Sequence, residues 1–215
     1  MSLQDTVTKQ YVSDPKVFAD AFNYLIYNGE QVIRPEQLTD LDATQFAIPY
    51  REDEEGKPEA TQKYRDVLKT LAVKTDERCT YLVLGIENQT NVHYAMPVRN
   101  MLYDAMQYEK QVRQLAAAHR KKHDAATSDE YLSGMSREDK IAPVITLVIN
   151  FGSKRWDGPL SLHEMMSEHP PEVRAFIQDY KVFLIDPMAM TDTDLEHLNS
   201  SLREVLSYIK YQHDQ

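Results

Sequence analysis

Two acidic residues lie in apolar stretches of the sequence, where burial alone would favour an apolar side chain. Asp66 precedes Val67-Leu68, and Glu87 follows the apolar run from Tyr81 to Ile86. An unpaired buried charge costs several kcal/mol, so such a carboxylate normally has a cation or a hydrogen-bond donor as its partner. Two such acids on neighbouring strands, with Gln89 two residues after the second, could form a divalent-metal site for phosphodiester chemistry.

The two stretches around these acids predict buried strands at about 65–73 and 80–88. Both are rich in β-branched and large apolar residues, and neither shows helical periodicity. Side chains alternate between the faces of a strand, so Glu87 and Gln89 share one face and Asn88 points to the other. The pattern therefore places an acid and an amide side by side at the end of the second strand.

The N-terminal part of the chain predicts a helix that begins after Ser13-Asp14-Pro15, because a capping residue followed by proline is typical of a helix start. It ends at Asn28-Gly29. Its apolar stripe consists of Val17, Phe18, Ala21, Phe22, Leu25 and Ile26. Residues 38–49 predict a first strand, and residues 51–62 a solvated charged turn.

A long helix is predicted from Pro97 to about His123. Its apolar stripe consists of Val98, Met101, Leu102, Ala105, Tyr108, Val112, Leu115 and Ala116. The remaining elements are expected to be a loop with a helical turn at 124–140, a strand at 143–151, short helices at 161–167 and 171–179, a strand at 181–186 and a final helix at 194–211. Together these elements indicate a mixed α/β fold.

Composition limits the function classes. The 215 residues are expected to form one domain, or one domain with an appendage, and the net charge of −10 argues against a non-specific nucleic-acid coat protein. It does not exclude a nuclease, which concentrates carboxylates at its centre. Cys79 is the only cysteine, which excludes an internal disulfide framework and a zinc–cysteine cluster. No apolar run reaches the roughly 18 residues of a membrane span, so a cytoplasmic protein without membrane association is expected.

Several short motifs occur in an order and at spacings that resemble the recombination-promoting nuclease family, a group of transposase-like proteins in the PD-(D/E)xK nuclease superfamily. The motifs are Asp5 and Lys9, Tyr64-Arg65-Asp66-Val67-Leu68, Ile86-Glu87-Asn88-Gln89, Pro97-x-Arg99-x3-Tyr103, and Pro143-x5-Ile149-x2-Gly152 followed by Trp156. The resemblance covers about residues 5–186. It implies a restriction-endonuclease-like mixed central β-sheet flanked by α-helices. It also implies a bacterial enzyme that cleaves DNA with a divalent metal ion and promotes recombination.

The resemblance also implies site residues. Asp66 and Glu87 match the two acidic positions that bind the metal, and the backbone carbonyl of Asn88 would complete the protein ligands. Mg²⁺, or alternatively Mn²⁺ or Ca²⁺, is the implied cofactor, since these hard cations prefer oxygen ligands. Gln89 occupies the third catalytic position. The candidate accessory residues are Asp5, Lys9, Asp20, Arg99 and Tyr103.

Gln89 stands where the wider superfamily has lysine. A full charge at about 4 Å is worth up to about 4 kcal/mol at an effective dielectric constant of 20. Glutamine can orient a water molecule or donate to a phosphate, but it brings no net charge. Weak or tightly regulated cleavage is therefore expected.

Structural interpretations of the same residues stay open. Asp66 could pair with Arg65, and Glu87 could accept from Arg99, which would then brace the acid together with Tyr103. The basic residues Arg113, His119, Arg120, Lys121, Lys122 and His123 suit the C-terminus of a helix as well as DNA contact. His119 and His123 have i,i+4 spacing but no third zinc ligand.

Two functions of different classes follow. The first is a metal-dependent DNA endonuclease of the recombination-promoting type, with DNA as its partner. The second is a catalytically weak or inactive relative that keeps the fold and binds DNA or protein, as a monomer or a homo-oligomer. Retention of both Asp66 and Glu87 favours the first, and the acidic net charge and Gln89 favour the second.

Overall fold

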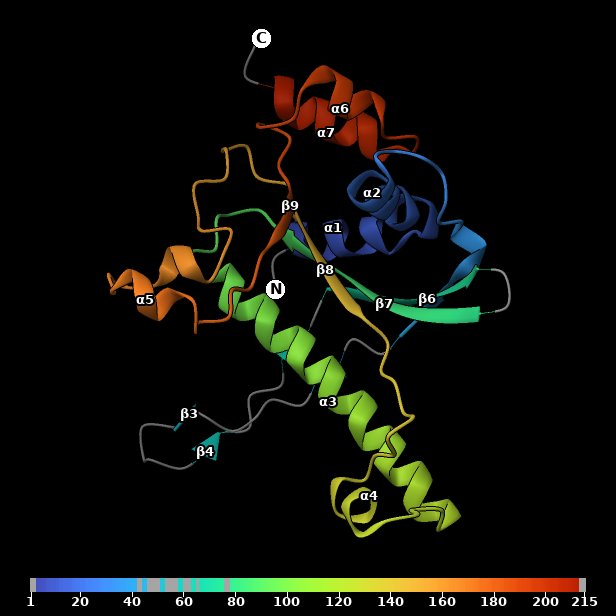
Figure 1. Cartoon of the computed structure of the whole chain (residues 1–215). Coiled ribbons are helices and arrows are strands. Elements are labelled where there is room, and N and C mark those ends of the chain that lie inside the picture. The colour runs from blue at the N-terminus through green and yellow to red at the C-terminus, as the bar shows by residue number, and fades with distance from the viewer. Residues whose placement is uncertain are drawn as a thin grey trace.

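A five-stranded sheet forms the centre of the protein in this computed structural model (Figure 1). In spatial order its strands are β1 (Leu38–Asp40), β6 (Val67–Thr75), β7 (Arg78–Gln89), β8 (Val144–Asn150) and β9 (Phe183–Ile185). The pairs β1–β6 and β6–β7 are antiparallel, and the pairs β7–β8 and β8–β9 are parallel. The structure describes residues 3–41, 44–45, 51–52, 58–59, 63–64, 66–75 and 78–212, with side chains described in 6–41, 66–71 and 82–212. This mixed sheet with flanking helices confirms the predicted α/β fold and agrees with a restriction-endonuclease-like core.

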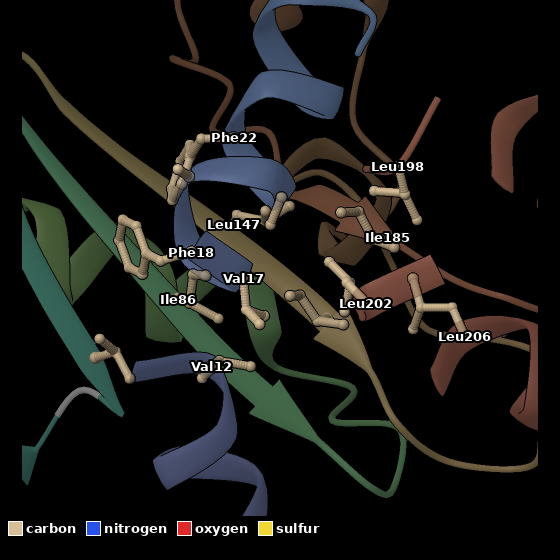
Figure 2. Close-up of a cluster of buried hydrophobic side chains, with 14 of the residues drawn as sticks. Val12, Val17, Phe18, Phe22, Ile86, Leu147, Ile185, Leu198, Leu202 and Leu206 are labelled. Carbon is tan, nitrogen blue, oxygen red and sulfur yellow. The ribbon is translucent and has the colours of Figure 1, made fainter. Parts of the chain in front are cut away.

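One face of the sheet is covered by the helices α1 (Leu3–Ser13), α2 (Pro15–Tyr27), α6 (Asp192–Glu196) and α7 (Leu202–Tyr211), as Figure 1 shows. Figure 2 shows the apolar side chains that these helices and the strands bury together. The labelled members are Val12, Val17, Phe18, Phe22, Ile86, Leu147, Ile185, Leu198, Leu202 and Leu206. The main core therefore includes the C-terminal helices, and burial of aliphatic and aromatic side chains stabilises this face.

Local signals explain where α2 begins and ends. The Asp14 carboxylate accepts a hydrogen bond from the backbone N–H of Lys16 at 2.7 Å, and Pro15 is the first helical residue. At the other end Asn28 adopts a left-handed conformation with φ 52°, followed by Gly29 with φ 90°. A side chain at Gly29 would also collide with the carbonyl oxygen of His197, 2.6 Å from an ideal Cβ. The predicted helix is confirmed, and α1 precedes it as a separate helix.

The other face of the sheet is covered by α3 (Met96–Lys122), close to its predicted bounds. Its buried face does not coincide with the apolar stripe of the sequence. Its buried residues are Met96, Pro97, Asn100, Tyr103, Asp104 and Gln107, whereas Val98 and Met101 of the expected apolar stripe are 41% and 37% exposed. The reason is that α3 packs on polar positions of the sheet: Thr146 donates to Asp104 at 2.5 Å.

The predicted first strand at 38–49 is confirmed only in part. Residues 38–40 form β1, which pairs with β6, while β2 (Thr44–Gln45) pairs with β5 (Lys63–Tyr64) outside the central sheet. The loose alternation in this region did not show that two short strands have different partners. The charged segment at 51–62 contains a two-stranded pair, β3 (Arg51–Glu52) with β4 (Pro58–Glu59), rather than a turn alone. Residues 46–50 and 53–57 lie outside the described residues.

The predicted C-terminal helix at 194–211 is interrupted. Helices α6 and α7 are separated by a turn at 197–201, because the carboxylate of Asp20 accepts hydrogen bonds from the backbone N–H groups of Asn199 and Ser200. The short helices near 161–167 and 171–179 are confirmed in shortened form as η2 (His163–Met165) and α5 (Pro171–Arg174), and α4 (Ser128–Ser133) is the expected helical turn of the 124–140 loop. No helix in the described part of the chain is long and apolar enough to span a membrane.

Candidate active site

The strand register brings Asp66 and Glu87 together. Val67 of β6 is the antiparallel partner of Ile86 of β7, so the residue before β6 faces the residue after Ile86. Asp66 lies in a bend directly before β6 rather than within the strand, and it is half-buried. Its Oδ2 accepts a hydrogen bond from the backbone N–H of Asn88 at 2.9 Å. The two acids therefore lie close together as the sequence predicted, but only Glu87 is within a strand, and Asp66 is the less buried of the two.

Glu87 is completely buried, with 0% of its side chain exposed. Nη2 of Arg99, on the first turns of α3, donates to Glu87 Oε2 at 3.1 Å. Arg99 Nε also donates to the hydroxyl of Tyr103 at 3.2 Å, and its guanidinium lies 5.5 Å from the centre of the Tyr103 ring. Residues four apart share one side of a helix, so α3 presents an arginine and a tyrosine to the buried acid as a unit. The predicted brace between Glu87 and Arg99 is confirmed.

The charges of this cluster change the protonation equilibria of its members. Burial lowers the pKa of Arg99, but Glu87, Tyr103 and Asp66 outweigh burial and the pKa is raised overall. Burial, followed by the charge of Glu87, raises the pKa of Tyr103. The charge of Asp66 also raises the pKa of both Arg99 and Tyr103, so its carboxylate lies near these two side chains of α3. The arginine is therefore a permanent cation between two acids, and the tyrosine is a neutral hydroxyl.

Gln89 lies on the same face of β7 as Glu87, as strand alternation requires. Its side-chain Nε2 donates to the backbone carbonyl of Asn88 at 2.8 Å, and Gln89 is nearly buried. The carbonyl that the resemblance implies as a metal ligand thus already accepts a hydrogen bond from a side chain, and a carbonyl oxygen has two lone pairs in all. The side-chain amide of Asn88 points the other way and has no hydrogen-bond partner among the described residues.

His93 is a residue of this region that the sequence did not single out. It lies in the loop between β7 and α3, and its Nδ1 is buried with no hydrogen-bond partner within the described part of the chain. Burial, followed by the charge of Arg99, lowers the pKa of His93. The imidazole is therefore neutral at pH 7. Nothing in the sequence indicated a role for His93, because it lies between two motifs and outside every apolar run.

Two more buried acids were not predicted. Asp104 on α3 accepts from Thr146 and from the Tyr180 hydroxyl at 2.6 Å. Asp186, after β9, accepts from Asn150 at 3.1 Å and from the backbone N–H of Trp156 at 2.9 Å. These contacts tie α3 and the 150–156 turn to the sheet. These hydrogen bonds of Asp104 and Asp186 are therefore structural.

The N-terminal accessory residues lie elsewhere or are only partly described. Asp20 is on α2, on the opposite face of the sheet, and its carboxylate accepts from Asn199 and Ser200. Lys9 is half-buried on α1, which packs against β6 and β7. The side chains of Asp5 and Cys79 and the whole of Arg65 lie outside the described residues. The structure therefore joins Arg99 and Tyr103 to the acid pair but not Asp20.

The two histidines of the basic segment have different roles. His119 contacts Asp124 through Nδ1 at 2.7 Å and Asp139 through Nε2 at 2.9 Å. His123 is the left-handed C-cap of α3, with φ 56°. Within the described residues, no three histidine, cysteine or acidic side chains are grouped as a metal site would require. A metal at Asp66 and Glu87 would therefore need backbone and water oxygens as well.

Comparison with known proteins gives a family. Residues 58–215 match the family described as "Putative transposase, YhgA-like", and the chain belongs to that family. The matched segment includes β6, β7 and α3, and with them Asp66, Glu87 and Arg99. No match was found among curated proteins or among solved structures.

Proposed function

We propose that this member of the YhgA-like transposase family is a divalent-metal-dependent DNA endonuclease. The observation that carries the proposal is the opposition of Asp66 and Glu87 across β6 and β7, with Glu87 fully buried and held only 3.1 Å from an arginine. A fold kept for packing alone has no need of two acids at this point, since burying a carboxylate is costly. Membership of a transposase-like family supports DNA as the substrate.

The donor set suits Mg²⁺, Mn²⁺ or Ca²⁺. Two carboxylates and the Asn88 carbonyl supply oxygen atoms, which these cations prefer, and the half-buried position of Asp66 leaves one side open to water and substrate. Asp66, Glu87 and the carbonyl would hold the ion. When bound, such an ion lowers the pKa of a coordinated water and offsets charge on the phosphate.

The side chains of this chain have separate roles in that reaction. Arg99 holds Glu87 in the metal-free site. When a metal ion takes its place at Glu87, the guanidinium can donate to a phosphate oxygen from the side of α3, because it has five N–H donors. Gln89 would leave the Asn88 carbonyl and orient the attacking water or donate to the phosphate. It adds no positive charge, so slow turnover is expected.

The test is nicking of supercoiled plasmid with Mn²⁺ or Mg²⁺ by wild type, Asp66→Asn and Glu87→Gln. Both variants should lose activity by about a hundredfold or more, while Glu196→Gln, a control at an exposed position of α6, stays within about twofold of wild type. Thermal melting with and without metal provides the second measurement, since a preformed site raises the melting temperature on binding. Nicking by Glu87→Gln at the wild-type rate would refute the proposal.

The closed Glu87–Arg99 pair favours a second candidate, a catalytically weak or inactive relative that binds DNA or protein. In that case Arg99 is the permanent partner of Glu87, and no cation replaces it. Metal-induced stabilisation discriminates between the two candidates. A melting temperature that does not change with Mn²⁺, together with absent nicking, would support the second.

A further inference from the structure

We propose that one side of α3 docks the phosphate backbone of duplex DNA and leads it to the acid pair. This basic stripe consists of Arg99, Lys110, Arg113, Arg120 and Lys121. The inference rests on the proposed function, because it assumes that DNA reaches Asp66 and Glu87. It assigns a surface and a binding mode that the acid pair alone does not give.

Helix geometry places these residues in one line. Successive residues are rotated by about 100°, so Lys110, Arg113, Arg120 and Lys121 all lie within about 60° of the direction of Arg99. The buried residues of α3 lie on one side of this direction, towards the sheet, at angles from about 40° for Tyr103 to about 160° for Pro97. The stripe therefore runs along the flank of α3, beside the face that packs on the sheet, and Arg99 joins it to Glu87.

Three of the five stripe residues are exposed, and three make no ion pair within the described part of the chain. Arg113 is 74% exposed, Arg120 and Lys121 are exposed, and Lys110 is half-buried. Lys110, Arg120 and Lys121 make no ion pair with any residue that the structure describes. The two acids of α3, Asp104 and Glu109, lie more than 60° from the direction of Arg99. Asp104 is hydrogen-bonded to Thr146, and Glu109 pairs with Arg113.

The stripe contains only basic residues, although the whole chain has 34 acidic and 24 basic residues. Cations in the last turn of a helix also offset its dipole, which accounts for Arg120 and Lys121. The dipole effect falls off within one turn, so it does not account for Lys110 and Arg113. Cations spaced along one side of the helix instead match a phosphate backbone, whose neutralisation supplies most of the non-specific affinity for DNA.

The length of the helix fits the same partner. The last buried residue of α3 is Gln107, yet the helix continues to Lys122 and carries α4 at its far end (Figure 1). From Arg99 to Lys121 the stripe spans about 33 Å at 1.5 Å per residue. One turn of B-form DNA is about 34 Å. A duplex lying along α3 would thus present backbone phosphates at both ends of the stripe.

The test is a matched pair of double variants. Lys110→Gln with Arg120→Gln removes two unpaired cations from the stripe, and Lys16→Gln with Arg203→Gln removes two exposed cations from α2 and α7 on the other face. Both proteins have the same net charge. Binding of a fluorescent duplex of about 30 base pairs is measured by anisotropy, without divalent metal, from about 50 to 200 mM salt.

The stripe variant should bind about tenfold more weakly, and the slope of log affinity against log salt should fall by about 2, one for each lost phosphate contact. The control pair should stay within about twofold of wild type. Equal losses in both pairs would mean that only total charge matters and would overturn the proposal. So would equal effects on single-stranded DNA or polyglutamate, because the surface would then be a general polyanion site.

These outcomes are separate from those for nuclease activity. A stripe effect with no metal-dependent nicking would leave the DNA surface standing and remove the catalytic proposal. Metal-dependent nicking together with identical DNA binding by the stripe and control variants would support the catalytic proposal and remove the DNA surface. Circular dichroism of both double variants verifies that each keeps the helix content of wild type.

Discussion

Asp20 and Glu87 are both buried carboxylates, but they lie on opposite faces of the sheet and are satisfied by different groups. Asp20 accepts from the backbone N–H groups of Asn199 and Ser200 and from the Ser200 hydroxyl, at 2.7 to 3.0 Å. Its partners come from a turn about 180 residues away in sequence. Glu87 instead accepts from the side chain of Arg99, which is 30% exposed.

This difference separates a structural acid from a candidate functional one. Backbone donors in a packed turn cannot move away without opening the fold, so the Asp20 contacts cannot be exchanged for a ligand. An arginine side chain can rotate and leave its acid to another cation, provided that one is available. Glu87 also has a second acid, Asp66, across the strand pair. The polar face of the sheet is therefore where exchange of partners is physically possible.

Asp20→Ala should have the largest effect on stability. It leaves two backbone N–H groups of the α6–α7 turn without their acceptor, and hydrogen bonds to charged groups contribute about 1.5–3 kcal/mol. We expect a loss of about 2–4 kcal/mol in the free energy of unfolding, measured by urea denaturation. The increase in melting temperature caused by Mn²⁺ should be unchanged.

Asp14→Ala is the matched control on the same helix. It removes only the N-cap contact to Lys16 and should cost about 1 kcal/mol. If Asp20→Ala instead abolished the metal-induced shift at little cost in stability, Asp20 would belong to the metal site and the comparison with Glu87 would fail.

Arg99→Met should have an intermediate effect and sharpen the comparison from the other side. Loss of the guanidinium leaves the Glu87 carboxylate without its cation, and the metal-free protein should lose roughly 1–3 kcal/mol, a range reduced because Arg99 is partly exposed. Because arginine and metal compete for Glu87, Mn²⁺ should raise the melting temperature of the variant more than that of wild type.

Arg113→Met serves as the control, since its pair with Glu109 is exposed to solvent and should contribute little to stability. A variant that loses stability and gains nothing from metal would show that Arg99 is a structural partner of Glu87, as the inactive alternative requires.

The sequence predicted the parts of the site that depend on local pattern. The apolar runs predicted β6, which begins directly after Asp66, and β7, which includes Glu87, and the proline at position 97 predicted the start of α3 within one residue. The acid pair could be proposed because charged residues in such runs are unusual. These signals lie within a few residues of the positions that they predict.

Long-range partners could not be predicted in the same way. Nothing near Asp20 shows that its carboxylate binds Asn199, and the apolar residues of α3 indicated the wrong buried face, since Thr146 and Tyr180 select the polar one. The break in the C-terminal helix did have a local signal, because Asn199, Ser200 and Ser201 compete with helical hydrogen bonding. That signal was outweighed by the amphipathic pattern on either side.

The smallest expected effect concerns His119, which connects the 124–139 segment to α3. Its contacts with Asp124 and then Asp139 raise the pKa of His119 above its ordinary value of 6.5. A raised folded-state pKa means that the stabilisation is fully present below about pH 6.5 and is lost as pH rises through the folded value. The pKa of Asp124 is lowered by the same histidine, so its share is present above about pH 4 and is lost only in stronger acid.

Hydrogen-exchange protection factors of residues 124–139, corrected for intrinsic rates, should therefore be higher at pH 5.5 than at pH 8. His119→Gln should remove this difference and leave protection in α2 unchanged. Equal protection of 124–139 at the two pH values in wild type would show that the histidine bridge does not hold this segment, and that α4 is fixed by its packing on α3 alone.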